Sequence, residues 1–246
     1  MKRLENKIAF ITGGGRGMGA AISKRLSEEG ASVVLTYSKS REKAEAVASE
    51  INAKGGNARA IEADSIDPKA LTAAIQKTIA ELGPIDILVN NAGIYIGKEF
   101  ESHTLEDYEE IMAINVRAVY VAALAAAPLM PKNGRVITIG SNMADNAVGP
   151  QTTLYTMSKA ALTGFTRGLA RDLGGRGITV NLVQPGPINT DMNPSDTELA
   201  DFLRSRMALS EYGTGEDVAG LVAYLASEEG KYITGTSITI DGGLNA

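Results

Sequence analysis

Tyr155 and Lys159 are the two side chains whose types and spacing are best suited to chemistry. Residues four apart lie on the same face of a helix, so the phenol and the ammonium would point into the same space. A free tyrosine titrates near ~10, and a fixed cation beside it stabilises the phenolate and lowers that pKa. The pair therefore predicts a proton donor. The same spacing also arises by chance on surface helices, so the prediction needs support from the rest of the chain.

A glycine-rich stretch at residues 12–19 follows a predicted strand and opens a predicted helix. Glycines in this context let backbone N–H groups at a helix N-terminus approach a pyrophosphate. Two registers fit, Gly15-x-Gly17-x-x-Ala20 and Gly13-x-x-x-Gly17-x-Gly19. Both predict a dinucleotide-binding loop. Its expected cofactor contacts are Gly13, Arg16, Gly17, Met18 and Gly19.

The end of the second predicted strand indicates which dinucleotide is bound. A carboxylate at this place selects NAD by accepting hydrogen bonds from the ribose hydroxyls, but the residues after Thr36 include no acid before Glu42. Charge-assisted hydrogen bonds to phosphate are strong, so a group of cations and hydroxyls here favours NADP(H) over NAD(H). The residues that could hold a 2′-phosphate are Arg16 and Ser38, with either Lys39 or Arg41. Tyr37, at the same strand end, is also expected to contact the cofactor.

Short apolar strands alternate with helical patterns along the chain, which predicts a parallel sheet covered by helices on both faces. The predicted strands are Ile8–Ile11, Ser32–Thr36, Ala58–Glu62, Ile85–Val89, Arg135–Ile139, Thr179–Val183 and Ser237–Ile240. The predicted helices include Ala20–Glu29, Lys43–Ala53, Lys69–Leu82 and Leu105–Met130. No linker or repeat divides residues 1–246, so we expect one domain. Residues 187–210 begin without clear periodicity and predict a substrate-binding lid.

Composition excludes several classes of function. The 246 residues include no cysteine, which removes disulfides, thiolate nucleophiles and zinc-thiolate sites, and His103 alone cannot build a histidine-rich metal centre. A net charge of -5 disfavours a nucleic-acid binder. The apolar segment 119–130 is too short to span a bilayer, so we expect a cytoplasmic protein without a membrane partner. His103 precedes a predicted helix start at Thr104 and is expected on the surface or as a cap.

The ordered set of motifs resembles the short-chain dehydrogenase/reductase family over the whole chain, and within it the 3-oxoacyl-[acyl-carrier-protein] reductase branch. The family uses the register Gly13, Gly17 and Gly19. The resemblance implies an α/β fold, a Rossmann-type doubly wound parallel seven-stranded sheet in the order 3-2-1-4-5-6-7. It also implies cofactor contacts after the third and fourth strands and in a later loop that holds the nicotinamide. These are Asp64, Ser65, Asn91, Ala92, Gly93, Pro185, Gly186, Ile188 and Thr190.

The resemblance also implies a catalytic tetrad of Asn115, Ser141, Tyr155 and Lys159. As hydride leaves the nicotinamide, Tyr155 would donate a proton to the developing alkoxide, and Ser141 would hydrogen-bond the same oxygen. Lys159 would lower the Tyr155 pKa and hold the nicotinamide ribose, so both also count as cofactor contacts. Asn115 would support a water chain from Lys159 to solvent.

The function expected from the tetrad is NADPH-dependent reduction of a ketone, either a 3-oxoacyl group or another carbonyl compound. Arg176 and Lys132 could contact an acidic carrier protein, although both also fit ordinary solvated charges. The alternatives are a broad-scope alcohol dehydrogenase or carbonyl reductase of free ketones, and a non-catalytic nucleotide- or ligand-binding protein on the same fold. A serine hydrolase does not fit, because Ser141 lacks the Gly-x-Ser-x-Gly context. The resemblance further implies a homotetramer, and the alanines within 122–127 would allow close helix packing.

Overall fold

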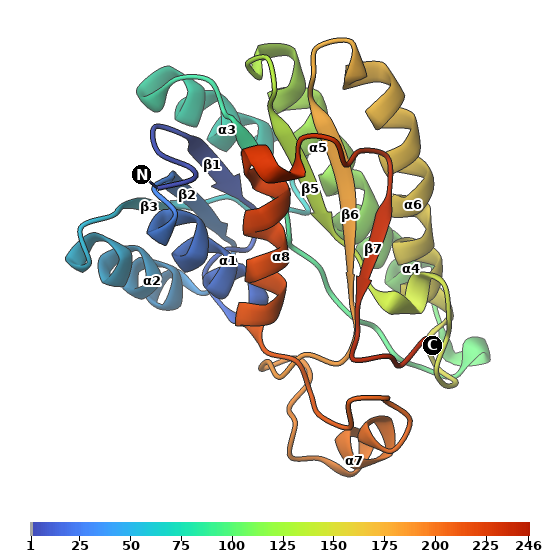
Figure 1. Ribbon diagram of the computed structural model, residues 1–246. Coiled ribbons are helices and arrows are strands. Elements are labelled where there is room, and N and C mark those ends of the chain that lie inside the picture. The colour runs from blue at the N-terminus through green and yellow to red at the C-terminus, as the bar shows by residue number, and fades with distance from the viewer. Residues whose placement is uncertain (1) are drawn as a thin grey trace.

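Seven short strands form one parallel sheet in the computed structural model, which describes residues 2–246 (Figure 1). The strand order β3-β2-β1-β4-β5-β6-β7 confirms the predicted order. The strands are β1 (Ile8–Ile11), β2 (Ser32–Tyr37), β3 (Asn57–Glu62), β4 (Ile87–Asn90), β5 (Arg135–Ile139), β6 (Thr179–Pro185) and β7 (Ser237–Ile240). The order reverses between β1 and β4, where the carboxyl ends of the strands form the crevice in which such sheets bind dinucleotides.

Helices cover both faces of this sheet, which confirms the doubly wound α/β fold (Figure 1). One face carries α1 (Gly17–Glu28), α2 (Arg41–Ala53) and α8 (Gly215–Ala226). The other carries α3 (Pro68–Leu82), α5 (Ala118–Ala126) and α6 (Thr153–Gly174), with α4 (Leu105–Met112) packed near α6. The remaining helix, α7 (Glu198–Arg204), projects beyond the carboxyl ends of the strands (Figure 1).

Short helical turns lie at several connections. They are η1 (Phe100–Ser102), the π-helical turn η2 (Ala113–Arg117), η3 (Ala127–Leu129), η4 (Asn142–Ala144) and η5 (Glu228–Gly230). Two of these turns position predicted site residues. Asn115 lies within η2, and Ser141 is the residue immediately before η4.

Neighbouring residues of β1 show why the strands are apolar throughout. Side chains alternate across a strand, so Phe10 and Ile11 point to opposite faces of the sheet. Phe10 belongs to the buried cluster that includes Ile75 of α3, whereas Ile11 belongs to the one that includes Ile22 of α1. Both side chains are fully buried. Burial of each such side chain contributes about 1.5–3 kcal/mol to the stability of the fold. Packing on both faces therefore fixes the position of β1 relative to the helices.

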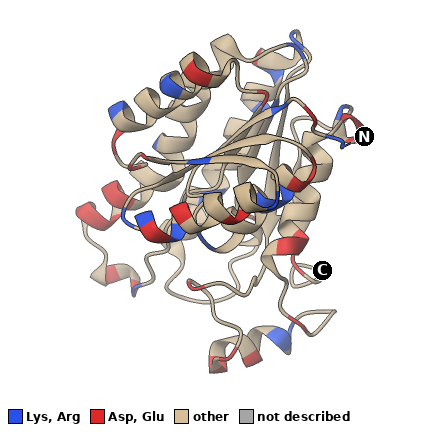
Figure 2. Cartoon of the chain, turned by 90° about the vertical axis from the view of Figure 1, so that its left-hand side faces the viewer, with Lys and Arg blue, Asp and Glu red and all other residues tan. Residues whose placement is uncertain are grey.

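Charged residues of both signs are mixed along the helices that face the viewer in Figure 2. Exposed ion pairs of the protein include Arg59–Glu81 at 3.0 Å and Lys54–Glu50 at 2.9 Å. Isolated exposed pairs contribute little to stability, about 0–1 kcal/mol each.

The helical run Leu105–Leu129 joins α4, η2, α5 and η3 and confirms the predicted helix 105–130. Within the described residues it is long and apolar enough to cross a membrane by length and composition alone, and it is longer than the apolar segment 119–130. Half of its most apolar window is buried inside the protein. Ala118, Ala122 and Ala126 pack in the core on the sheet, so packing within the fold accounts for its apolar composition.

His103 is the C-cap of the turn η1, where its N–H donates to the Phe100 carbonyl at 3.3 Å, so its predicted role as a cap is confirmed there. The helix cap is its neighbour Thr104, whose hydroxyl accepts a hydrogen bond from the Asp107 N–H at 3.2 Å while the Asp107 carboxylate accepts one from the Thr104 N–H at 3.0 Å. The His103 side chain is 7% exposed, and its Nδ1 lies 3.7 Å from an Asp107 carboxylate oxygen. The cap of α4 is Thr104 because the reciprocal capping box needs a short hydroxyl at that position.

Candidate active site

The glycine loop is fastened to the end of β4. The Thr12 hydroxyl oxygen accepts hydrogen bonds from the N–H groups of Asn91 at 3.0 Å and Ala92 at 3.1 Å. The Asn91 side-chain amide in turn donates to the carbonyls of Thr12 and Gly13, both at 3.0 Å. Residues 12–13 and 91–92 therefore form one rigid unit at the carboxyl edge of the sheet, although they are far apart in the sequence.

Two features of this loop fit a pyrophosphate. A Cβ on Gly19 would lie 2.3 Å from the Gly13 carbonyl oxygen, so the loop can fold this tightly only with glycine at position 19. Arg16, the N-cap of α1, makes no side-chain cap, and the first turn of α1 has no acid. The free N–H groups and the positive end of the helix dipole are thus left for an anion. The close contact involves Gly13 and Gly19. Both glycines belong to the second of the two predicted registers, Gly13-x-x-x-Gly17-x-Gly19.

The residues after β2 lie where the glycine loop meets α2. Gly15 lies against the first turn of α2, since a Cβ on it would be 2.8 Å from the Ala44 Cβ. Ser38 and Lys39 follow β2 and are exposed beside this contact. Tyr37, in contrast, is buried, and its hydroxyl accepts a hydrogen bond from the Arg41 guanidinium at 2.9 Å.

The structure also distinguishes between the two predicted alternatives Lys39 and Arg41. Arg41 is engaged by the Tyr37 hydroxyl and lies 3.6 Å from Glu62 and 3.7 Å from Glu45, all of which hold it toward β3 and its own helix. Lys39 has no ion pair within residues 2–246. Lys39 is therefore the cation of the two that is available to a phosphate.

The predicted nicotinamide loop lies against the glycine loop. A Cβ on Gly17 would approach the Thr190 side chain at 3.5 Å, and Ile188 is buried and bridges to Gly213. Asp191 continues this segment and pairs with Lys43 of α2 at 2.8 Å, which holds the pKa of its carboxyl below the usual value, with Arg16 contributing less. The segment thus spans from the sheet edge to α2.

The remaining predicted cofactor residues lie at neighbouring strand ends. Asp64 follows β3 by two residues, and its carboxylate accepts a hydrogen bond from the Ile66 N–H at 3.1 Å, with Ser65 between them. Pro185 is the last residue of β6, where it pairs with Ile240 of β7. Gly186 is pressed against Asp241, since a Cβ on it would lie 2.4 Å from the Asp241 Cβ.

The four predicted catalytic residues converge beside this edge. Tyr155 lies in the first turn of α6, and the Ser141 hydroxyl is close enough to exert a lowering influence on the pKa of its phenol. The Lys159 ammonium lies 5.6 Å from the centre of the Tyr155 ring and donates to the Ile139 carbonyl at 3.1 Å. Helical spacing places the phenol and the ammonium together, as predicted.

Asn115 reaches this group through the π-helical turn. Its amide oxygen accepts from the Ile94 N–H at 2.9 Å, and its amide nitrogen donates to the Ile94 carbonyl at 2.9 Å and to the Ser158 hydroxyl at 3.0 Å. Gly93 separates it from the lysine, because a Cβ there would lie 3.3 Å from Asn115 Oδ1 and 3.4 Å from Lys159 Nζ. Such π turns recur at functional sites because they turn one extra side chain inward.

Burial dominates the titration of the pair. It raises the pKa of Tyr155, an effect that the Ser141 hydroxyl partly offsets and the nearby Tyr95 adds to. Burial also lowers the pKa of Lys159 to about 8. The predicted lowering of the Tyr155 pKa by Lys159 is therefore not the main influence, because desolvation disfavours both charged forms.

Replacing the buried ammonium is expected to stabilise the fold. Lys159→Met should raise the free energy of unfolding by about 1–2 kcal/mol at pH 7, because it removes the desolvation cost of a charge in a side chain that is 4% exposed. Burial depresses the Lys159 pKa from 10.5 to about 8, so between these values the unfolded chain binds more protons and wild-type stability rises with pH. The variant's advantage should therefore shrink from pH 7 to pH 10. Urea unfolding across this range tests it, with the exposed Lys77→Met as control, and an advantage independent of pH would contradict it.

Tyr95 is a site residue that the sequence reasoning missed. Its ring packs edge-on against Tyr155, with 5.1 Å between ring centres and 70° between planes. Its hydroxyl donates to the Gln151 carbonyl at 3.3 Å, and the residue is 45% exposed. It forms an aromatic wall beside the phenol. The available signal was its position two residues after Gly93.

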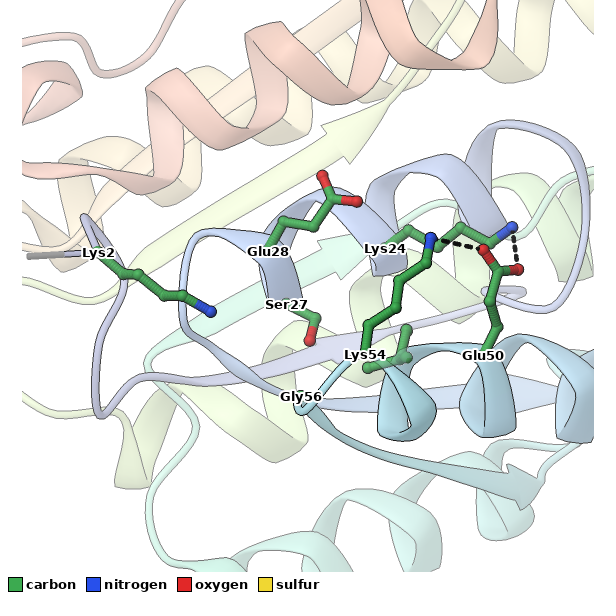
Figure 3. Close-up of a pocket in the computed structure, with 8 residues that line it drawn as sticks. Lys2, Lys24, Ser27, Glu28, Glu50, Lys54 and Gly56 are labelled. Carbon is green, nitrogen blue, oxygen red and sulfur yellow. Dashed lines mark hydrogen bonds and ion pairs between the residues drawn. The ribbon is translucent and has the colours of Figure 1, made fainter.

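A concave site at the other end of the sheet does not suit a phosphate. It has a volume of about 140 Å³ and lies between the C-terminal ends of α1 and α2 (Figure 3). Glu50 binds Lys24 at 2.6 Å and Lys54 at 2.9 Å, as Figure 3 shows. The negative ends of two helix dipoles also disfavour an anion there. None of the residues that line this site is among the predicted cofactor contacts.

The fold and the site together define a dinucleotide-binding α/β protein, and comparison with known proteins gives its family. A family model described as enoyl-(acyl carrier protein) reductase matches residues 13–245. The chain belongs to the short-chain dehydrogenase/reductase family of oxidoreductases, and within it resembles the 3-oxoacyl-[acyl-carrier-protein] reductase branch.

Three relatives illustrate the range of this similarity. The cyclic-di-GMP-binding biofilm dispersal mediator protein of Escherichia coli K12 is 42% identical over 100% of both chains. The 3-oxoacyl-[acyl-carrier-protein] reductase FabG of Staphylococcus aureus is 38% identical over 97% of this chain and 98% of its own. The structure of a short-chain dehydrogenase from Burkholderia cenocepacia J2315 in complex with NADP is 52% identical, with a TM-score of 0.98, and covers 99% of this chain and 100% of its own.

Proposed function

We propose that this protein is an NADPH-dependent reductase that converts a ketone to an alcohol with Tyr155 as the proton donor. The observation that carries the proposal is the convergence of Ser141, Tyr155 and the buried Lys159. The Lys159 ammonium lies 5.6 Å from the centre of the Tyr155 ring and donates to the carbonyl of Ile139, two residues before Ser141. A phenol kept protonated by burial, with a second hydroxyl close enough to affect its pKa, is suited to donating toward an oxygen that gains negative charge.

Each residue has a distinct part in this proposal. NADPH, when bound, supplies the hydride. Tyr155 and Ser141 hold the substrate oxygen between their hydroxyls, and Tyr155 gives it the proton. Lys159, whose pKa of about 8 lets it gain or lose a proton near neutrality, holds the nicotinamide ribose and returns a proton toward Tyr155. Asn115 fixes the backbone at Ile94 and so the position of Gly93 between itself and Lys159.

The proposal includes the phosphate end of the cofactor and the lid. Arg16, Ser38 and Lys39 bind the 2′-phosphate, and the N-terminus of α1 binds the pyrophosphate, in line with the NADP complex of the Burkholderia relative. Residues 187–210 act as a lid of the single domain 1–246, supported by the projection of α7 beyond the strand ends. The cytoplasmic location stays a prediction.

Four side chains bear on the kind of ketone that the protein would reduce. The aromatic ring of Tyr95 beside Tyr155 and the exposed Met192 in the lid favour an apolar carbonyl compound. The position of Arg176 does not favour a carrier-bound substrate, because its guanidinium already donates to the Ala127 carbonyl at 2.6 Å and to the Met130 carbonyl. It caps the C-terminal end of the α5–η3 helix. Lys132 remains exposed and available to an acidic carrier.

Arg176→Glu is expected to destabilise the protein by about 1.5–3 kcal/mol, because it removes charge-assisted hydrogen bonds and places a carboxylate at the negative end of a helix. Thermal or urea unfolding measures the loss. Arg167→Glu makes the same charge change at an exposed site in the middle of α6 and is the matched control. Unaltered stability, together with slower reaction of a carrier-bound substrate alone, would restore Arg176 as a docking residue.

One assay tests the reductase proposal. The protein is mixed with NADPH and a panel of ketones that includes a carrier-bound 3-oxoacyl substrate and a simple 3-oxo ester, and the loss of nicotinamide absorbance is followed. Turnover of any ketone supports the class. The carrier branch is supported if the carrier-bound substrate turns over faster than the simple ester and if Lys132→Glu slows only the carrier-bound reaction. Equal turnover of the two substrates supports a broad-scope reductase. Tight NADPH binding with no turnover of any member refutes the reductase.

The second candidate is a non-catalytic nucleotide-binding protein on the same fold. It is favoured by the Escherichia coli relative, which is named for binding cyclic-di-GMP. Calorimetric titration with cyclic-di-GMP separates the two. Micromolar binding that competes with NADPH, in a protein inactive toward the ketone panel, would replace the reductase proposal by this one.

A homotetramer is the proposed assembly. Tyr120 and Leu124 of α5 are more than half exposed, and Tyr120 packs edge-on against Phe165 of α6 at 6.4 Å. An exposed apolar strip along two neighbouring helices suits packing against a second copy. Light scattering of the purified protein gives the mass that tests this, and a monomer at micromolar concentration would exclude it.

A further inference from the structure

A reciprocal amide pair ties the segment after Ser141 to the turn 241–245. The Asn142 side-chain amide donates to the Asn245 side-chain oxygen at 3.1 Å, and the Asn245 amide donates to the Asn142 carbonyl at 2.9 Å. Asn146 adds a longer hydrogen bond to the same Asn245 oxygen at 3.4 Å. Asn142 is 3% exposed, so water competes little for these bonds. The Asn245 side chain thus forms hydrogen bonds with two asparagines, Asn142 and Asn146, that lie about a hundred residues before it in the sequence.

The same segment sets the orientation of the Ser141 hydroxyl. The Ser141 oxygen accepts a hydrogen bond from the Met143 N–H at 3.2 Å, which leaves its proton and one lone pair for Tyr155 and a substrate oxygen. The Asn142 carbonyl accepts from the N–H groups of Asp145 and Asn146 as well as from Asn245. Asn142 therefore links the turn that orients Ser141 to the Asn245 side chain.

The turn 241–245 is itself held on three sides. The Asp241 carboxylate accepts from the N–H groups of Gly243 at 2.9 Å and Asn245 at 3.0 Å. Asp241 also packs against Gly186, and the Gly242 carbonyl accepts from the Leu209 N–H at 3.0 Å at the end of segment 187–210. Because these contacts fix the backbone at position 245, its side chain presents a rigid partner to Asn142.

We infer that Asn245 is a positioning residue for Ser141. By holding the Asn142 backbone, it keeps the turn of residues 142–144 in the arrangement that directs the Ser141 hydroxyl toward the oxygen shared with Tyr155. This inference rests on the proposed reductase function for its kinetic consequence, whereas its structural part is independent of any substrate. Geometry matters at this point because a misplacement of about 1 Å in a reacting group can cost ~10²-fold in rate.

A purely structural tether is the competing explanation. In that case loss of Asn245 would lower stability or weaken cofactor binding, and it would slow the reaction equally whether or not Ser141 is present. A positioning role makes the opposite prediction. The effect of Asn245 should disappear once the hydroxyl that it positions has been removed, because interacting residues are not additive.

The experiment is a double-mutant cycle of Asn245→Ala with Ser141→Ala, measured by single-turnover hydride transfer at saturating NADPH. Asn245→Ala alone is expected to slow transfer about 10- to 100-fold. In the Ser141→Ala background the same change should cost less than about 2-fold. The NADPH Kd, from nicotinamide fluorescence, should be unchanged. Asn57→Ala, which removes an exposed amide hydrogen bond to Ser32 at the distal edge of the sheet, is the matched control.

Amide hydrogen exchange supplies a readout without turnover. The N–H groups of Met143, Ala144, Asp145 and Asn146, which bond within this turn, should exchange faster in Asn245→Ala, while β1 and β4 keep their protection. Three results for Asn245→Ala would overturn the inference. They are an equal slowing of hydride transfer in the wild-type and Ser141→Ala backgrounds, an increased Kd for NADPH, and unchanged amide exchange at residues 143–146. If wild-type protein reduces no ketone, the reductase proposal fails by itself, and exchange alone then decides whether Asn245 holds the Ser141 turn.

Discussion

Tyr155→Phe is expected to lower the rate of ketone reduction by about 10²–10⁴-fold while the NADPH Kd changes less than about 2-fold. The substitution removes one oxygen and leaves the ring, which packs edge-on against Tyr95 and lies 5.6 Å from the Lys159 ammonium. The cofactor phosphates bind at the other end of the crevice in our proposal, so their contacts are preserved. Initial rates and nicotinamide fluorescence titration measure the two quantities.

The pH dependence of wild-type activity gives a second test of the role of Tyr155. In wild type, burial raises the Tyr155 pKa, so the phenol should stay protonated and active through neutral and mildly alkaline pH. Activity that falls above pH 8 would instead report loss of the Lys159 proton. Tyr232→Phe, at a 98% exposed position, is the matched control and should keep full activity. Substantial turnover by Tyr155→Phe would assign the proton transfer to another group.

The sheet could be predicted because each strand carries its own signal. Ile8–Ile11 and Arg135–Ile139 are apolar runs bounded by polar or glycine residues, and the structure has both strands with these bounds. The start of β4 was placed two residues early, at Ile85, because Ile85 is as buried as the strand residues although it precedes the strand. Apolar patterning reports burial rather than pairing.

The site was only partly predictable. Tyr155 and Lys159 are related by local helical geometry, which spacing alone describes. The π-helical turn at Asn115 interrupts that periodicity, so its inward direction could not be read from a regular 3.6-residue repeat. The contacts of Tyr95 with Tyr155 and of Asn245 with Asn142 join segments far apart in the sequence, and no local pattern encodes them.

Electrostatic roles were the least predictable. From its charge, Arg176 fitted either a carrier contact or an ordinary solvated charge, yet it bonds two backbone carbonyls at a helix end. The lowering of the Tyr155 pKa was inferred from the neighbouring cation, yet burial has the larger effect on both groups. Desolvation depends on the surrounding packing, which composition and spacing do not contain.

Ser38→Asp is expected to weaken NADPH binding by about 10- to 100-fold and to strengthen NADH binding. Ser38 is the first residue after β2, exposed beside the contact between Gly15 and α2. A carboxylate there would repel the 2′-phosphate and accept hydrogen bonds from the ribose hydroxyls of NADH, which is how this strand end selects NAD. Fluorescence titration with both cofactors gives the two Kd values.

The control separates this local effect from general charge. Ser49→Asp makes the same change on an exposed position of α2 and should leave both Kd values unaltered. In wild type, the NADPH Kd should rise with ionic strength more steeply than the NADH Kd, because only the 2′-phosphate draws on Arg16 and Lys39. Ser38→Asp should remove most of that difference. If the variant still prefers NADPH as strongly as wild type does, the 2′-phosphate lies elsewhere than between Arg16 and the end of β2.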